Sequence, residues 1–121
     1  MFAGLGIILG AFGAHALKPL LTPEQLVTFE TAVRYQMYHA FGLLFSGLLH
    51  HLVPSRLLRT AAVFFIIGIF LFSGSLYAIT LLKMQGEVGL GGVGIITPIG
   101  GLFFILGWIF LVLASLSRRL S

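Results

Sequence analysis

The feature that most limits the fold of this chain is an unbroken run of uncharged and mostly apolar residues, Thr60 to Leu82. A helix of about 20 such residues crosses the hydrocarbon core of a bilayer, which is about 30 Å thick. The rest of the chain has the same character: 59% of its 121 residues are hydrophobic and 8% are charged, against about 25% charged in soluble domains. The sequence therefore predicts an all-α, polytopic membrane protein with one domain, residues 1–121.

The apolar segments between polar residues, glycines and prolines divide the chain into four expected helices that cross the membrane. These expected spans are residues 2–17, 35–53, 60–82 and 98–116. Helices that short loops join in a single compact domain pack against their neighbours. The sequence therefore predicts a four-helix bundle.

Two further segments lie between these spans. Thr22-Pro23-Glu24-Gln25 has the pattern of a helix start, with Thr22 as N-cap and Gln25 in the capping-box position. Residues 23–33 are therefore expected to form an amphipathic lead-in at the membrane interface, before the second span. Lys83 to Thr97 is rich in glycine, which disfavours helix. It is predicted to be a loop that partly dips into the interface, with Pro98 beginning the fourth span.

The basic residues predict an orientation. The seven Lys and Arg lie at segment ends and form no basic stripe, so the net charge of +4 does not indicate nucleic acid. Arg34 is left out of the comparison of basic residues on the two sides, because we expect it to pair with Glu30 at the membrane edge. The side with more basic residues then faces the cytoplasm. The two sets are Arg56, Arg59, Arg118 and Arg119 on the cytoplasmic side, and Lys18 and Lys83 opposite. Both termini are expected to be cytoplasmic.

Most of the scarce polar side chains gather in Phe29–Phe41, around the start of the second span. Residues four apart on a helix lie on adjacent faces, so these side chains form a polar seam that continues along the span. We expect the seam to face neighbouring helices and not lipid. The candidate polar or ligand-binding residues are His15, Glu30, Arg34, Tyr35, Tyr38, His39, Ser46 and Tyr77.

Two interpretations of this seam remain open. His15 and His39, at similar depth on facing helices, are a possible pair of haem ligands, but hydrogen bonds from each histidine to nearby groups are the favoured interpretation. Arg34 either pairs with Glu30 or reaches the headgroups. Its alternative role is to hold an anionic headgroup or a quinone, with Tyr35 and nearby side chains as hydrogen-bond donors.

Small residues spaced along the first and fourth spans predict close helix packing, because glycine lets two helix backbones approach in lipid. The expected packing positions are Gly6, Gly10, Gly13, Gly100, Gly101 and Gly107. Such faces join helices within one chain or between copies, so a homo-oligomer or a larger membrane complex is expected.

The residues that are absent exclude several chemistries. The chain has no Cys, which removes disulfides, iron–sulfur clusters and thiol catalysis. It has no Asp, so no Ser-His-Asp set is available. The glycines of residues 86–94 follow no strand and precede no Lys-Ser or Lys-Thr, so they do not indicate a nucleotide site. No metal site, cofactor or enzymatic activity is expected.

Four motifs occur in order along nearly the whole chain. They are Gly10-Ala11-Phe12-Gly13-Ala14-His15, Tyr35-Gln36-Met37-Tyr38-His39, Ser73-Gly74-Ser75-Leu76-Tyr77, and Thr97-Pro98-Ile99-Gly100-Gly101 followed by Gly107-Trp108. With these motifs the chain resembles the YgdD and YwdK family, small bacterial membrane proteins of unknown function. The resemblance implies a four-helix protein of the cytoplasmic membrane and brings no activity or cofactor. Family members usually carry several more residues before the first motif, and this departure leaves the native length of the first span open.

Three hypotheses about function follow. The first is a non-enzymatic packing or accessory subunit, in contact with membrane lipids and with other copies or partners. The second is a module that binds a lipid, a quinone or a haem. The third is a solute or ion pathway in an oligomer, lined by the polar faces of the second and third spans.

Overall fold

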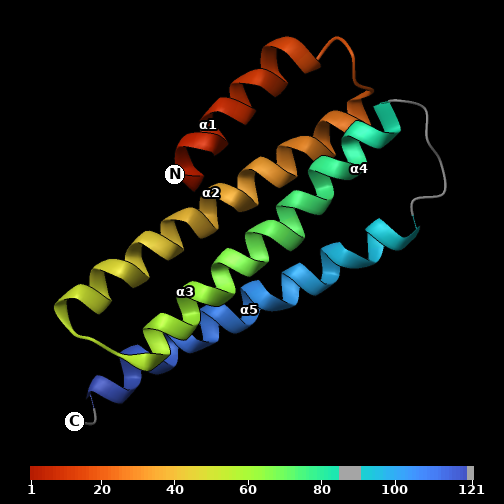
Figure 1. Cartoon of the computed structure of the whole chain (residues 1–121). Helices are drawn as coiled ribbons and strands as arrows, with labels where there is room; N and C mark the ends of the chain where they lie inside the picture. Colours follow the sequence, from red (N-terminus) through yellow and green to blue (C-terminus); the bar gives the residue numbers. More distant parts are fainter. Residues whose placement is uncertain (85–90, 120–121) are drawn as a thin grey trace.

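A computed structural model describes residues 1–84 and 91–119, and every regular element in them is helical (Figure 1). α1 (Phe2–Phe12) continues through a π-helical turn, and α2 (Pro23–Leu52) follows after a short connection. The third rod consists of α3 (Arg56–Gly68), a π-helical turn and α4 (Gly74–Met84), and the last rod is α5 (Gly91–Arg119). The two π-helical turns are Gly13–Leu17 and Ile69–Ser73. The all-α, four-helix architecture is therefore confirmed.

The four rods lie in an open row and do not close into a ring. In the described residues, α1 packs on α2, α2 packs on the third rod, and the third rod packs on α5. Among the described residues, the backbones of α1 and α5 at the ends of the row make no close contact, and α2 meets α5 over a short stretch only. Figure 1 shows the same order across the molecule, with the third rod between α2 and α5. One face of the third rod is consequently open between its two neighbours.

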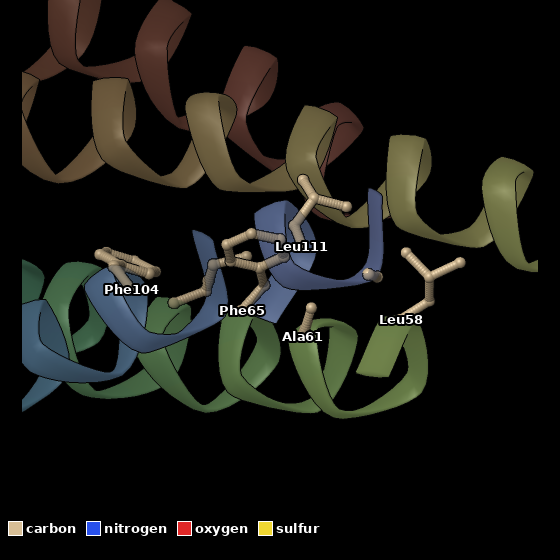
Figure 2. Close-up of a cluster of buried hydrophobic side chains, with 7 residues drawn as sticks. Leu58, Ala61, Phe65, Phe104 and Leu111 are labelled. Atoms are coloured by element: carbon tan, nitrogen blue, oxygen red, sulfur yellow. The ribbon is translucent and has the colours of Figure 1, made fainter. Parts of the chain in front are cut away.

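The tightest packing lies between α3 and α5. Figure 2 shows the buried cluster from these two helices and the first residue of the second π-helical turn, in which Phe65 is fully buried. Its members are Leu58, Ala61, Phe65, Ile69, Phe104, Leu111 and Ala114. Gly107 makes the close approach possible, because a Cβ there would lie 2.8 Å from the Phe65 ring. The cluster fixes α5 against the third rod.

A smaller apolar cluster holds α1 on the opposite side of the row. Leu17, Leu21 and Phe29 are buried together, and the ring of Tyr77 packs against them from α4. Gly13 lies directly on the Phe29 ring. This cluster therefore fixes the connection between α1 and α2.

The start of α2 has the predicted capping box. Thr22 Oγ1 accepts a hydrogen bond from the Gln25 backbone N–H, and Gln25 Oε1 accepts one from the Thr22 N–H, both at 3.1 Å. These bonds satisfy two backbone donors that the first helical turn would leave unpaired. The expected lead-in, residues 23–33, is the first part of α2 and continues without a break into the expected span.

The predicted loop from Lys83 to Thr97 is wrong for a large part of its length. α5 already begins at Gly91, so Pro98 lies inside the helix and does not start it. Glycine and proline are tolerated in helices among apolar surroundings, because a broken helix there would leave backbone groups unsatisfied. Ser75 Oγ also hydrogen-bonds Thr97 Oγ1 across α4 and α5, which holds this early turn in place. The rest of the predicted loop, residues 85–90, lies outside the described residues.

Within residues 1–84 and 91–119, two helices are long and apolar enough to cross a membrane, Arg56–Lys83 and Gly94–Ser117. Phe2–Leu17 is apolar but shorter, at about 24 Å for a helix of this length. α2 has 30 residues, or about 45 Å, but more polar residues. α1 begins beside Ala40 and Leu44, part of the way along α2.

Candidate functional site

The open face of the third rod forms a groove between α2 and α5, with a volume of about 730 Å³. Along its rim Tyr38, Phe41 and Ile105 are each more than half exposed, so the groove opens sideways from the rods. Its lining residues are Tyr35, Tyr38, His39, Phe41, Phe72, Gly101, Phe104, Ile105 and Trp108.

A close backbone contact between the third rod and α5 lies next to the groove. A Cβ on Gly100 would collide with the backbone nitrogen of Phe72, in the π-helical turn of the third rod. The Phe72 ring lies 4.7 Å from the Tyr35 ring and 5.4 Å from the Phe104 ring. Phe72 thus connects the aromatic side chains of α2 and α5 across the third rod.

His39 is the central polar residue of the groove and is 4% exposed. Its Nε2 lies 3.0 Å from the Trp108 indole nitrogen, which can only donate. Nε2 is therefore the acceptor. Nδ1 carries the proton and donates a hydrogen bond to the Tyr35 carbonyl oxygen at 2.7 Å. The imidazole also stacks on the Phe104 ring, with centroids 3.4 Å apart. His39 is thus neutral and has both nitrogens occupied.

The geometry does not support His15 and His39 as a pair of haem ligands. His15 is exposed, and it lies two residues from Gly13, which packs on Phe29, about 15 Å along α2 from His39. Both nitrogens of His39 already have partners. Among the described residues there is also no group of three or more side chains suited to hold a metal ion.

Gln36 joins three helices and was missed by the sequence reasoning. Its Oε1 accepts a hydrogen bond from the Tyr77 hydroxyl of α4 at 2.7 Å, and its Nε2 donates to the Phe2 carbonyl of α1 at 2.7 Å. The side chain is 3% exposed. The signal that could have identified Gln36 is its place in the motif around Tyr35 and His39. Nothing in the sequence indicated that its partner lies in α1.

Three buried hydroxyls of the second and third spans are satisfied within the protein. Ser46 Oγ donates to the Gly42 carbonyl at 2.8 Å, and Thr80 Oγ1 donates to the Leu76 carbonyl at 2.9 Å. Ser73 Oγ donates across to the Ala32 carbonyl of α2 at 2.7 Å. These groups join and stabilise the rods, so their geometry gives no support to a hydrated path along them.

The charged members of the polar seam point away from the rods. Glu30 and Arg34 are both exposed, and the interactions of the described residues do not include the ion pair expected between them. Tyr38 is 53% exposed at the groove rim, with its ring 5.7 Å from Tyr35. The seam therefore divides into an inward part around His39 and an outward part around Arg34.

The expected packing glycines differ in how closely their neighbours approach. A Cβ at Gly6 would meet Met37 Sδ at 2.5 Å, and Gly13, Gly100 and Gly107 are equally confined. Gly10 and Gly101 have only ordinary contacts, at 3.5 and 3.7 Å. Gly68, which the sequence reasoning did not select, lies directly against the Phe104 ring and so allows Phe104 to pack between the third rod and His39.

The four helical rods of the described residues, two of them apolar and long enough to cross a bilayer, are typical of a small helical membrane protein. More specifically, the chain belongs to a family described as protein of unknown function (DUF423), which matches residues 9–101. The resemblance seen in the sequence is thereby confirmed.

Similar proteins include three bacterial relatives, all named UPF0382 membrane proteins. One from Staphylococcus epidermidis is 43% identical over 88% of this chain and 82% of its own length. YwdK from Bacillus subtilis is 39% identical over 92% and 86%. A protein from Haemophilus influenzae is 37% identical over 93% and 86%. No solved structure matches the chain.

Proposed function

We propose that this protein is a non-enzymatic membrane protein that binds a neutral, lipid-soluble ligand in the groove between α2 and α5. The observation that carries the proposal is the groove itself: about 730 Å³, walled almost entirely by apolar and aromatic side chains, and open along one side. Small-molecule sites have this volume and character, with a few polar groups that orient the ligand.

Depth in the membrane supports a neutral ligand. Ile105 lies at the middle of the candidate span Gly94–Ser117, and Trp108 lies one turn further along. With α5 across the bilayer, Ile105 is about 15 Å from either headgroup region. No described lining residue carries a formal charge, and an unpaired charge at this depth is costly. A charged headgroup is therefore a poor occupant.

The orientation that we propose is multi-pass, in the cytoplasmic membrane, with the C-terminus in the cytoplasm. α2 ends, α3 begins and α5 ends at one end of the row, which therefore carries Arg56, Arg59 and the C-terminal end of α5 (Figure 1). Lys18 and Lys83 mark the other end. The N-terminus of α1 points towards the first of these ends, in agreement with the expectation that it too is cytoplasmic.

Native mass spectrometry of the full chain tests the binding proposal. Gly101 lines the groove, and a Cβ there meets only ordinary contacts, so Gly101→Leu fills the groove without a backbone clash. Gly47 lies on α2 with open space around it, so Gly47→Leu is the matched control. A lipid-soluble species that stays bound to the wild type and to Gly47→Leu, and is lost from Gly101→Leu, supports the proposal. Identical bound masses in all three proteins contradict it.

A packing or accessory role, with copies or other membrane proteins as partners, stays a prediction. The open row leaves the outer face of α5 uncovered, but lipid covers such a face equally well. The groove indicates a function more specifically than the uncovered face of α5 does, because its polar groups have defined positions.

A further inference from the structure

The groove has a chemical character that narrows its ligand beyond the proposed function, on which this inference rests. We propose that the ligand is a lipid quinone, whose flat ring lies among the aromatic side chains of the groove and whose carbonyl oxygens accept hydrogen bonds from Tyr35 and Tyr38. The isoprenoid tail leaves through the open side into the lipid.

The first argument is the aromatic wall. All lining residues except Gly101 and Ile105 carry an aromatic ring. An acyl chain gains nothing specific from such a wall, since aliphatic side chains would fit it as well. A flat conjugated ring gains offset stacking or edge contacts with each neighbouring ring, beyond the apolar area that it buries. The lining therefore favours a ring over a chain.

The second argument is the set of polar groups that are still available. His39 gives one nitrogen to the Tyr35 carbonyl and the other to Trp108, whose single N–H is used in the same bond. The hydroxyls of Tyr35 and Tyr38 have no partner among the described residues, and both side chains line the groove. A phenol hydroxyl donates a hydrogen bond to a carbonyl oxygen without any charge on either side. The site thus offers neutral donors to a neutral acceptor.

The third argument excludes the main alternatives for a flat ring. A haem needs an axial ligand, and the only imidazole in the groove has both nitrogens bonded and one face covered by Phe104. A phospholipid keeps its charged headgroup at the interface, and the groove lining offers no charged side chain to hold it. A quinone has its acceptors on the ring and needs no charge.

Trp108 provides the measurement, because it lines the groove and is the only tryptophan in the chain. The full chain is reconstituted in phosphatidylcholine nanodiscs and titrated with decylubiquinone or menaquinone-4, with excitation that tyrosine does not absorb. We expect saturable quenching in the wild type and in Gly47→Leu. Gly101→Leu should show only weak, linear quenching. The same linear quenching in all three proteins overturns the inference.

The hydroxyl variants test the proposed contacts directly. Tyr35→Phe and Tyr38→Phe keep the rings and remove one donor each, so each should weaken quinone binding about fivefold. Tyr77→Phe is the matched control, since Tyr77 bonds Gln36 outside the groove and should leave the affinity unchanged. A double variant Tyr35→Phe/Tyr38→Phe that binds as tightly as the wild type overturns the inference.

The two proposals fail separately. If quinone quenching is not saturable but native mass spectrometry still shows a bound species that Gly101→Leu removes, the groove binds a different lipid and only the quinone assignment is wrong. If neither measurement depends on Gly101→Leu, the groove is not a ligand site and both proposals are wrong.

Discussion

His39 and Trp108 join two helices that otherwise meet over a short stretch, through one indole N–H and one imidazole nitrogen. Removing either partner alone leaves the other unsatisfied in an apolar site. Trp108→Phe and His39→Leu should each destabilise the fold, and the double variant should cost less than their sum. The coupling energy expected for such a bond between membrane helices is about 0.6 kcal/mol and at most about 1.7 kcal/mol. The coupling energy is measured by denaturant-induced unfolding, in detergent, of the wild type, the two single variants and the double variant.

The control for this cycle is a pair that lies in the same groove but shares no hydrogen bond. Ile105→Ala combined with His39→Leu serves this purpose, since Ile105 lines the groove without a polar atom in its side chain. The structure predicts that the losses of unfolding free energy add up in the control pair. In the pair of His39 and Trp108, the loss in the double variant should be smaller than the sum of the two single losses. Additive costs in both mean that the bond contributes nothing to stability.

At this scale the sequence predicted the direction of His39 but not its partner in α5, and it did not predict that Glu30 and Arg34 point outward. His39 was expected to face protein, and it is 4% exposed with polar atoms on both nitrogens. Its local bond to the Tyr35 carbonyl follows from helical spacing. Trp108 is 69 residues further along the chain, and no local pattern fixes how two distant helices are aligned. Gln36 was missed for the same reason.

At the level of elements, two neighbouring glycines of α5 make a sharp comparison. Gly100 faces the backbone of Leu71 and Phe72, which cannot move aside, whereas a Cβ at Gly101 would lie 3.7 Å from the Phe72 ring. Gly100→Ala should therefore destabilise the protein by about 1–3 kcal/mol, the usual range for overpacking. Gly101→Ala should change stability by less than about 0.5 kcal/mol. Thermal unfolding of both variants tests this, and equal midpoints would contradict the close contact.

The docking of α1 provides a second prediction about elements. Gln36→Leu removes the donor to the Phe2 carbonyl and the acceptor for Tyr77, while Tyr77→Phe removes only the latter bond. We expect faster amide hydrogen exchange at the start of α1 in Gln36→Leu, with little change in α3 and α5. Tyr77→Phe should leave α1 close to wild type. If both variants loosen α1 equally, the bond to Phe2 is not what holds it.

The sequence predicted that the four helical rods exist, but it did not predict where α5 begins. Thr22 and Gln25 gave the beginning of α2 through capping chemistry that operates within a few residues. Gly91 to Thr97 was misjudged because helix propensity measured in water penalises glycine. The contact between Gly100 and the third rod and the bond from Thr97 to Ser75 decide the structure there. Both are tertiary contacts, which propensity does not contain.

For the whole molecule, the difference between an open row and a closed bundle determines whether a groove exists. In a closed bundle of four rods α1 and α5 would be neighbours, and the face of the third rod between α2 and α5 would be covered. The sequence predicted the number of rods and their amphipathic faces, but both arrangements satisfy those faces when lipid is the surrounding medium. Hydrophobic pattern alone therefore does not distinguish them.

Cross-linking distinguishes the two arrangements, and the absence of natural cysteine makes the test clean. Gly10→Cys with Val33→Cys joins α1 to α2, because a Cβ at Gly10 would lie 3.5 Å from the Val33 side chain. Ile7→Cys with Ile105→Cys places exposed thiols on α1 and α5, whose described backbones make no close contact in the open row. With a short bifunctional maleimide in nanodiscs, the first pair should cross-link within one chain and the second should not. Intramolecular cross-linking of the second pair would show a closed bundle, and the groove would then be occupied by the protein itself.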